Sequence, residues 1–161
     1  MRELCTRRQS TNRLLQRLDD TFFMLKIEFA DTVAFAAWYR SLSLTARLAI
    51  DSTLLFVSSL EDTRQTPNKL YKVLFAGIAE LRIGKNLGEA LRIAKVSLPS
   101  TTCKRDEGVL LRLFCHALTT RHLLILNGYD KAADPRSLRQ KFEIQKAIAI
   151  LESWRLQNDV F

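Results

Sequence analysis

The sequence is short of the residues from which metal and disulfide sites are built. It has two histidines, His116 and His122, and its three cysteines, Cys5, Cys103 and Cys115, form no CxxC pair. Neither set has the spacing of zinc ligands, so we expect no metal site. An odd number of scattered cysteines is typical of a reducing compartment, which predicts a cytoplasmic protein with Cys115 buried in a strand.

Long hydrophobic runs and the common catalytic motifs are also missing. No apolar run approaches the ~20 residues that span a bilayer, and the basic N-terminus lacks the apolar core of a secretory signal. The chain has no nucleophile elbow, no Walker loop and no dinucleotide-binding fingerprint. The stretch Gly84-Lys85-Asn86-Leu87-Gly88 is too short for a phosphate loop, and we interpret it as a hairpin turn. We therefore expect no cofactor and no membrane partner.

Positive charge is what the sequence has in excess. Its 25 Lys and Arg residues outnumber its 17 Asp and Glu residues, which gives a formal net charge of +8. Such a charge attracts polyanions and speeds encounters with nucleic acid or acidic proteins, although it also serves solubility alone. The basic residues are scattered over several predicted elements, which argues against a membrane surface. The charge therefore predicts a polyanionic or acidic partner.

The 161 residues fit one domain preceded by a distinct basic segment. Leu14, Leu15 and Leu18 form a short amphipathic stripe within residues 1–23. Met24, a second candidate start, stands directly before the first strand-like run. We interpret residues 1–23 as an N-terminal extension that the core does not need, and residues 24–161 as the folded domain.

Hydrophobic periodicity predicts an α+β domain. Alternation predicts strands at residues 25–29, 78–83, 90–98, 110–118 and 122–127, and helical spacing predicts helices at 33–42, 46–60 and 136–156. Turns are expected at 84–86, at 119–121 and at Asn127-Gly128, a polar loop at 99–108, and an N-cap at Asp134. This order predicts a small twisted antiparallel sheet. Two N-terminal helices and a C-terminal helix should pack on one face of it, leaving the other face partly open.

Two arginines stand at outward positions of the predicted strands. Arg82 and Arg112 each lie between apolar neighbours, so both should project from the open face of the sheet. Each alone is typical of a solvated strand face. Together with Tyr129 and Lys131, which follow the last strand, they favour a phosphodiester site. Further basic groups expected to join this face are Arg92 and Lys95.

Short motifs also occur in a definite order along the chain. They are Glu80-Leu81-Arg82, Arg112-Leu113-Phe114, Gly128-Tyr129-Asp130-Lys131 and Glu143-Ile144, after a first helix that contains Trp38–Leu42. In this order they resemble the RelE/ParE superfamily of toxins, most closely its HigB-like, phage-derived branch. The similarity spans roughly residues 25–154 and leaves the N-terminal extension outside it. It implies a RelE-like fold.

The resemblance implies the toxin of a type II toxin–antitoxin system, one that cuts messenger RNA in the ribosomal A site. A ribose 2′-OH attacks the adjacent phosphate, which needs a proton acceptor, cations around the phosphorane and an acid for the leaving oxygen. By resemblance, Arg82 and Arg112 clamp the phosphate and Lys131 shares its charge. Tyr129 orients the ribose, transfers a proton or stacks on a base. The other expected RNA-binding residues are Lys85, Arg92, Lys95 and His116.

The resemblance also implies two partners, a cognate antitoxin and messenger RNA on the ribosome. Two other functions stay open. Some members of the superfamily inhibit gyrase and cut no RNA, in which case the cations serve only for binding. A small adaptor whose sheet face docks an acidic helix would also account for the positive charge.

Overall fold

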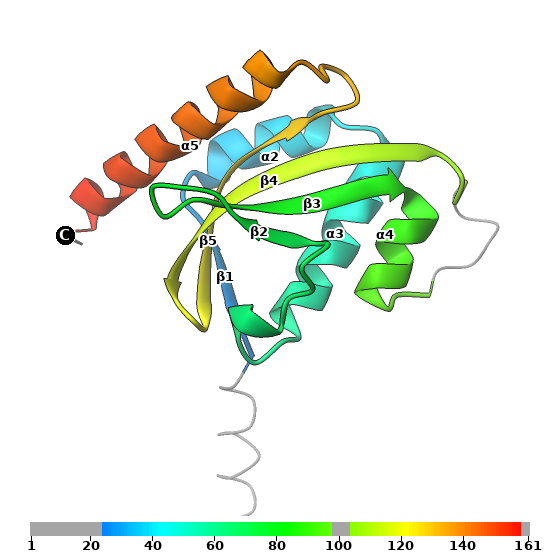
Figure 1. Cartoon of the computed structure of the whole chain (residues 1–161), viewed down its shortest axis with the longest axis horizontal. Coiled ribbons are helices and arrows are strands. Elements are labelled where there is room, and N and C mark those ends of the chain that lie inside the picture. Colours follow the sequence, from blue (N-terminus) through cyan, green and yellow to red (C-terminus); the bar gives the residue numbers. More distant parts are fainter. Residues whose placement is uncertain (1–23, 98–103, 159–161) are drawn as a thin grey trace, which may run out of the picture.

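The computed structural model describes residues 24–97 and 104–158, which form one sheet with helices packed against it (Figure 1). The elements are β1 (Lys26–Phe29), α2 (Thr32–Ser41), α3 (Leu44–Ser58), a 3-10 helix (Thr63–Gln65), β2 (Tyr71–Val73), β3 (Ala79–Asn86), α4 (Leu87–Ala94), β4 (Gly108–Thr119), β5 (His122–Asp130) and α5 (Ser137–Gln157). The predicted α+β class is confirmed. The predicted extension at residues 1–23, part of the predicted loop at 99–108, Cys5 and Cys103 lie outside the described residues.

The five strands form a mixed sheet in the order β1-β5-β4-β3-β2. The pairs β2–β3, β3–β4 and β4–β5 are antiparallel, as predicted, but β1 runs parallel to β5. The prediction of an entirely antiparallel sheet is therefore wrong. A short turn fixes the direction of the two strands that it joins, whereas most of the chain separates β1 from β5 and no local signal sets their direction.

Helices cover both faces of the sheet (Figure 1). α3 and α4 pack on one face, in a core that includes Leu81 and Leu113. α5 packs on the other face, where Ile144 and Leu151 share a second core with Phe114. The prediction that all helices share one face is wrong. Consecutive side chains of β4 point to opposite faces of the sheet, and both faces are covered by an apolar core instead of one being open to solvent.

The strand predicted at residues 90–98 is wrong, because its first half belongs to the helix α4. Its buried residues follow the helical spacing i, i+3, i+4 and i+7: Leu87, Ala90, Leu91 and Ala94. The Asn86 side chain caps this helix, accepting a hydrogen bond from the Glu89 N–H at 2.8 Å. The turn predicted at 84–86 is also wrong, since β3 stays in register with β4 as far as the Asn86↔Gly108 pair.

The β4–β5 hairpin is confirmed, but β5 extends further than predicted. It passes through Asn127-Gly128 without turning and ends at Asp130. The glycine serves close packing, because a Cβ on Gly128 would lie 2.5 Å from Cη2 of Trp38 on α2. Asn127 serves helix docking, since its Nδ2 donates to Glu143 of α5 at 2.9 Å. Both residues that signalled a turn are thus used for tertiary contacts.

The start of α5 also differs from the prediction. Its N-cap position is Arg136, without a side-chain cap, and not Asp134. The Asp134 carboxylate instead accepts two hydrogen bonds from the Arg136 guanidinium, at 2.8 and 2.7 Å. This ion pair holds the pKa of Asp134 down at about 2, chiefly through those hydrogen bonds.

Candidate functional site

Three of the predicted site residues lie side by side on the sheet. Arg82 of β3 is paired with Arg112 of β4, and Arg112 is paired with Tyr129 of β5. Residues directly opposite each other on neighbouring strands point to the same face. The structure therefore brings Arg82, Arg112 and Tyr129 together in one row across three strands.

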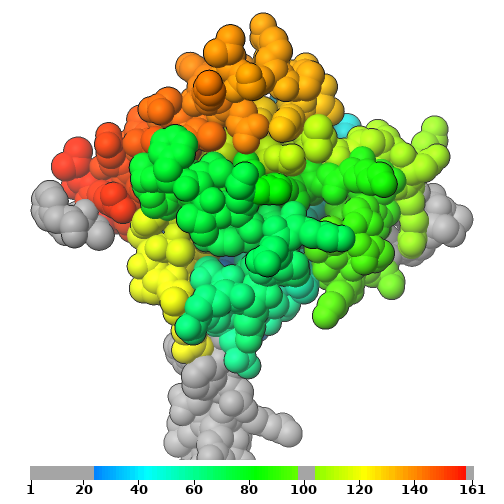
Figure 2. All heavy atoms as spheres, in the orientation of Figure 1, coloured from blue at the N-terminus to red at the C-terminus, as the bar shows by residue number. Residues whose placement is uncertain are grey.

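The face that carries this row is covered rather than open. The side chain of Arg112 is 12% exposed and that of Arg82 is 34% exposed. Tyr129 is buried. Figure 2 shows atoms of α5, in orange and red, in contact with green atoms of the β2–β3 region. The expected projection of both arginines into solvent is wrong, because α5 packs where the open face was predicted.

A buried carboxylate, Glu80, lies between the two arginines. Its Oε1 accepts a hydrogen bond from Nε of Arg82 at 2.9 Å, and its Oε2 lies 4.0 Å from Nε of Arg112. Glu80 is 3% exposed, so its charge and those of the arginines interact with little solvent screening. Burial lowers the pKa of Arg112, while Glu80 opposes that shift. The Arg82 guanidinium is therefore held by an internal anion, whereas that of Arg112 lies near the same carboxylate without a hydrogen bond to it.

Gln140 of α5 completes this group of side chains. Its Nε2 donates to Oε2 of Glu80 at 3.2 Å, and its Oε1 accepts from Nζ of Lys131 at 3.3 Å. The amide thus connects the lysine after β5 to the carboxylate on β3. We call Glu80, Arg82, Arg112, Tyr129, Lys131 and Gln140 the β-face cluster.

Sequence reasoning missed two members of the β-face cluster. Glu80 belongs to the motif Glu80-Leu81-Arg82, of which the resemblance assigns a role only to Arg82. The signal was available, since residues two apart on a strand share a face. Gln140 had no such signal, because it is brought to Glu80 from 60 residues away by the docking of α5.

Tyr129 is as deeply enclosed in the β-face cluster as Glu80, each being 3% exposed. Its ring stacks on that of Phe114, with centroids 5.9 Å apart and planes 6° from parallel. Its hydroxyl is buried and has no hydrogen-bond partner among the described residues. Burial raises the pKa of this phenol, while the nearby Arg112 acts in the opposite direction. The hydroxyl is therefore a neutral donor near neutral pH, and it is free to bond to something else.

The predicted RNA-binding residues do not join the β-face cluster. Arg92 and Lys95 belong to α4 and its C-cap, and α4 packs in the core on the other face of the sheet. The Arg92 guanidinium is also engaged by Glu89, at 2.7 Å. Lys85 follows Ile83 by two residues on β3 and so lies on the α4 side. The predicted position of Arg92 and Lys95 on the same face as Arg82 is wrong because their segment is a helix.

His116 shares the face of the β-face cluster but lies further along β4. It stands four residues after Arg112, which is about 13 Å along a strand. Its Nδ1 lies 2.6 Å from the Gly77 carbonyl oxygen, and its Nε2 lies 3.3 Å from the Arg155 guanidinium. These contacts tie β4 to the β2–β3 hairpin and to the end of α5, which is a structural role.

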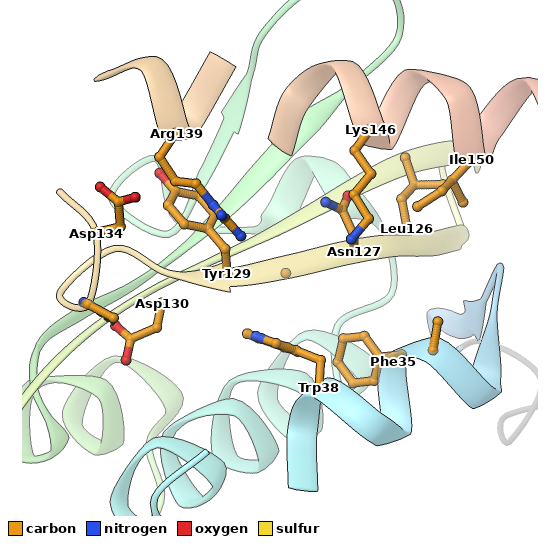
Figure 3. Close-up of a pocket in the computed structure, with 13 residues that line it drawn as sticks. Phe35, Trp38, Leu126, Asn127, Tyr129, Asp130, Asp134, Arg139, Lys146 and Ile150 are labelled. Atoms are coloured by element: carbon orange, nitrogen blue, oxygen red, sulfur yellow. Dashed lines mark hydrogen bonds between the residues drawn. The ribbon is translucent and has the colours of Figure 1, made fainter. Parts of the chain in front are cut away.

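A pocket of about 310 Å³ opens beside the β-face cluster, between α2 and α5 (Figure 3). Tyr129 is the one cluster residue in its wall. Figure 3 shows β5 running between Phe35 and Trp38 on α2 and Lys146 and Ile150 on α5. The arginines of the cluster therefore face α5, while this pocket follows the side edge of β5.

Other kinds of site find no support in the described part of the chain. No group of three or more His, Cys, Asp or Glu side chains there could hold a metal ion. None of its helices is long and apolar enough to cross a membrane. No protein-family model, curated protein or solved structure shows a significant match to this chain.

Proposed function

We propose that this protein is the toxin of a type II toxin–antitoxin pair and acts in the cytoplasm as a ribosome-dependent mRNA endonuclease. One observation carries the proposal. Tyr129, whose buried hydroxyl has no hydrogen-bond partner in the described part of the chain, lies in register with Arg112 and Arg82, on the sheet face that also carries Glu80. A neutral donor, two guanidinium groups and a carboxylate are the groups that phosphodiester cleavage by a 2′-OH needs.

The proposed reaction assigns each of these groups a role. The ribose 2′ oxygen attacks phosphorus and its proton passes to the Glu80 carboxylate. The bond from phosphorus to the 5′ oxygen breaks, and the leaving 5′ oxygen takes a proton from water. The products are a 2′,3′-cyclic phosphate and a free 5′ hydroxyl. Arg82 and Arg112 stabilise the charge on the phosphorane. Tyr129 donates a hydrogen bond and is not the base, because its pKa is raised.

For RNA to reach the β-face cluster, the N-terminal part of α5 would have to move away from the sheet. Arg82 and Lys131 are half-buried at its margin, whereas Arg112 and Tyr129 lie beneath α5. The two hydrogen bonds of Gln140, to Glu80 and Lys131, are the contacts that RNA phosphate would replace. The ribosome would hold the message in line and supply binding energy for this exchange, so cleavage of free RNA should be weak.

The test of the proposal is expression in growing cells, followed by primer extension on abundant messages. Cuts in phase with codons, together with arrested growth, are the expected result. A cognate antitoxin should restore growth, and the small reading frames adjacent to this gene are the candidates to co-express. Intact messages in arrested cells would contradict the endonuclease activity. Unimpaired growth would contradict the toxin as well.

A second function is favoured by the ion pair within the β-face cluster. Glu80 engages Arg82 directly and lies near Arg112, so the cluster neutralises part of its own positive charge. Such an arrangement suits a domain that binds nucleic acid, gyrase or an acidic protein without catalysis. DNA damage in expressing cells, with intact messages, would point to gyrase inhibition. If expression causes neither message cleavage nor DNA damage, the remaining function is that of a protein–protein adaptor.

A further inference from the structure

α5 has apolar side chains on the side that faces away from the sheet as well as on the side that packs against it. Glu143, Ile144, Ala147 and Leu151 are buried and mark the inner side. Exposed residues on the opposite side follow the helical spacing i, i+4, i+7, i+11, i+14 and i+18: Leu138, Phe142, Gln145, Ala149, Glu152 and Leu156. We call these six residues the α5 outer stripe.

The α5 outer stripe leaves three large apolar side chains in water. Leu138 is 73% exposed, Phe142 is 61% exposed and Leu156 is 68% exposed. Among the described elements α5 packs mainly against β4 and β5, and Figure 1 shows it at the outside of the molecule. A helix with apolar residues all round is typically buried on all sides. The outer side of α5 is therefore suited to contact with another protein.

The α5 outer stripe is arranged symmetrically about the middle of the helix. Leu138 lies nine residues before Ala147, and Leu156 lies nine residues after it. If two copies of α5 packed antiparallel about a twofold axis at Ala147, Leu138 would meet Leu156 of the second copy at both ends. Phe142 would lie next to Ala149 of the second copy, whose small side chain leaves room for the ring. The stripe is thus complementary to itself, as a twofold interface requires.

Two opposite charges give this pairing its direction. Lys141 and Glu152 lie eleven residues apart, which places them about 20° from each other around the helix and about 16 Å apart along it. Neither has an ion-pair partner in the part of the chain that the structure describes. In the antiparallel pair Lys141 lies beside Glu152 of the second copy, twice. A parallel pair would place like charges together, so the charges favour the antiparallel arrangement.

The other charged side chains along α5 lie outside this contact. Arg139 pairs with the buried Glu143, and Arg155 contacts His116. Arg139 and Lys146 stand about 80–100° around the helix from the centre of the stripe, at the margin of the contact. Lys141 and Glu152 are therefore the charges that a second copy would meet.

We propose that the α5 outer stripe is the interface of a symmetrical homodimer in which two copies of α5 pack antiparallel. The 21-residue helix is about 31 Å long, so the contact runs along the whole side of the domain. Removing Leu138, Phe142 and Leu156 of both copies from water supplies most of the affinity. The ion pairs at the rim fix the direction and add little affinity. The dimer does not depend on the proposed endonuclease activity.

The experiment is sedimentation equilibrium of the purified full-length protein from about 1 to 100 μM. We expect a monomer–dimer equilibrium. Leu138→Glu should weaken the dimer about tenfold or more. Leu55→Glu is the matched control, since Leu55 lies on α3 and is 64% exposed, and it should leave the equilibrium unchanged. A monomer at every concentration, or equal effects of the two substitutions, would overturn the proposal.

Charge reversal tests the antiparallel direction. Lys141→Glu or Glu152→Lys alone should weaken the dimer about threefold or more, and the double variant should restore it. The two side chains are about 16 Å apart within one helix, so rescue has to come from pairing between copies. Circular dichroism checks that each variant keeps its helices. A double variant as weak as the single ones would contradict the antiparallel dimer.

Discussion

Glu80 and Arg112 form the charged centre of the β-face cluster, and their burial changes what a mutation there will do. An exposed arginine on a strand can be removed with little loss of stability. Arg112 is different because its side chain is mostly buried, and it also donates from Nη1 to the Leu111 carbonyl at 2.9 Å. Loss of activity in an Arg112 variant would therefore have two explanations, altered chemistry and altered folding.

We predict that Arg112→Ala lowers the free energy of unfolding by about 1–3 kcal/mol, because it leaves Glu80 with fewer partners in a buried setting. Urea unfolding measures this, with Lys141→Ala as the exposed control that leaves the midpoint in place. In the Glu80→Ala background the same substitution should cost less. A full cost in both backgrounds would show that the two side chains are not coupled.

The raised pKa of Tyr71 in β2 predicts how the free energy of unfolding changes at alkaline pH. Burial raises its pKa from 10.0 to about 12. The folded state thus holds this proton more tightly than the unfolded state. The contribution of this phenol to the free energy of unfolding is therefore fully present below pH 10 and is lost as the pH rises toward 12. Urea midpoints measured from pH 8 to 12 should fall with a smaller slope in Tyr71→Phe, and an unchanged slope would contradict the assignment.

Gly128 is a position at which β5 and the Trp38 side chain of α2 pack closely. An added Cβ would lie 2.5 Å from Cη2 of Trp38 and 2.7 Å from Cδ2 of Leu113. We predict that Gly128→Ala destabilises the protein by about 1–3 kcal/mol through overpacking. Gly108→Ala is the matched control, since a Cβ there meets nothing within 4 Å. In a Trp38→Phe background the cost of Gly128→Ala should shrink, and an undiminished cost would contradict this packing.

The cap of α4 provides a test of the helix that periodicity failed to predict. Asn86→Ala removes the side-chain acceptor of the Glu89 N–H and should cost about 0.5–2 kcal/mol. Asn68→Ala, in an exposed loop, is the control and should have little effect. The measurement is again the free energy of unfolding. Equal effects of the two substitutions would show that the cap contributes nothing.

Local patterns predicted most elements of the fold but not their arrangement. Strands and helices with several clear periods were identified to within a few residues, as at the β4–β5 hairpin and α5. α4 was missed because it spans only Leu87–Ala94, too short for alternation and helical spacing to be told apart. The turn predicted at Asn127-Gly128 is wrong because Gly128 packs against Trp38 and Asn127 bonds to Glu143 within a continuous strand. Contacts between distant segments decided both outcomes.

The candidate site was predictable to the same extent. Alternation correctly placed Arg82 and Arg112 on one face, and the hairpin register added Tyr129. Two facts were beyond local reasoning. α5 crosses the face that carries the row, and β1 leaves half of one side of β5 unpaired. Both depend on where a helix and a strand from opposite ends of the domain dock, and no short sequence window contains that information.

The molecule as a whole presents a net charge of +8 while keeping two of its cations, Arg82 and Arg112, near the internal carboxylate of Glu80. The excess charge on the surface attracts a polyanion at long range. In the proposed function, the β-face cluster would act only after contact, once the start of α5 has moved aside and a phosphate has replaced the hydrogen bonds of Gln140. This separation of attraction from chemistry would restrict cleavage to RNA that is already held in place.

The most direct test of the proposed function compares the wild-type protein with Tyr129→Phe on purified ribosomes that carry a defined message. Because the hydroxyl has no partner among the described residues, its loss should leave stability within about 0.5 kcal/mol, as urea unfolding will show. We predict codon-phased cuts with the wild type and cleavage slower by about 10²-fold or more with Tyr129→Phe. Equal cleavage by the two proteins, or no cleavage by the wild type, would contradict the proposal.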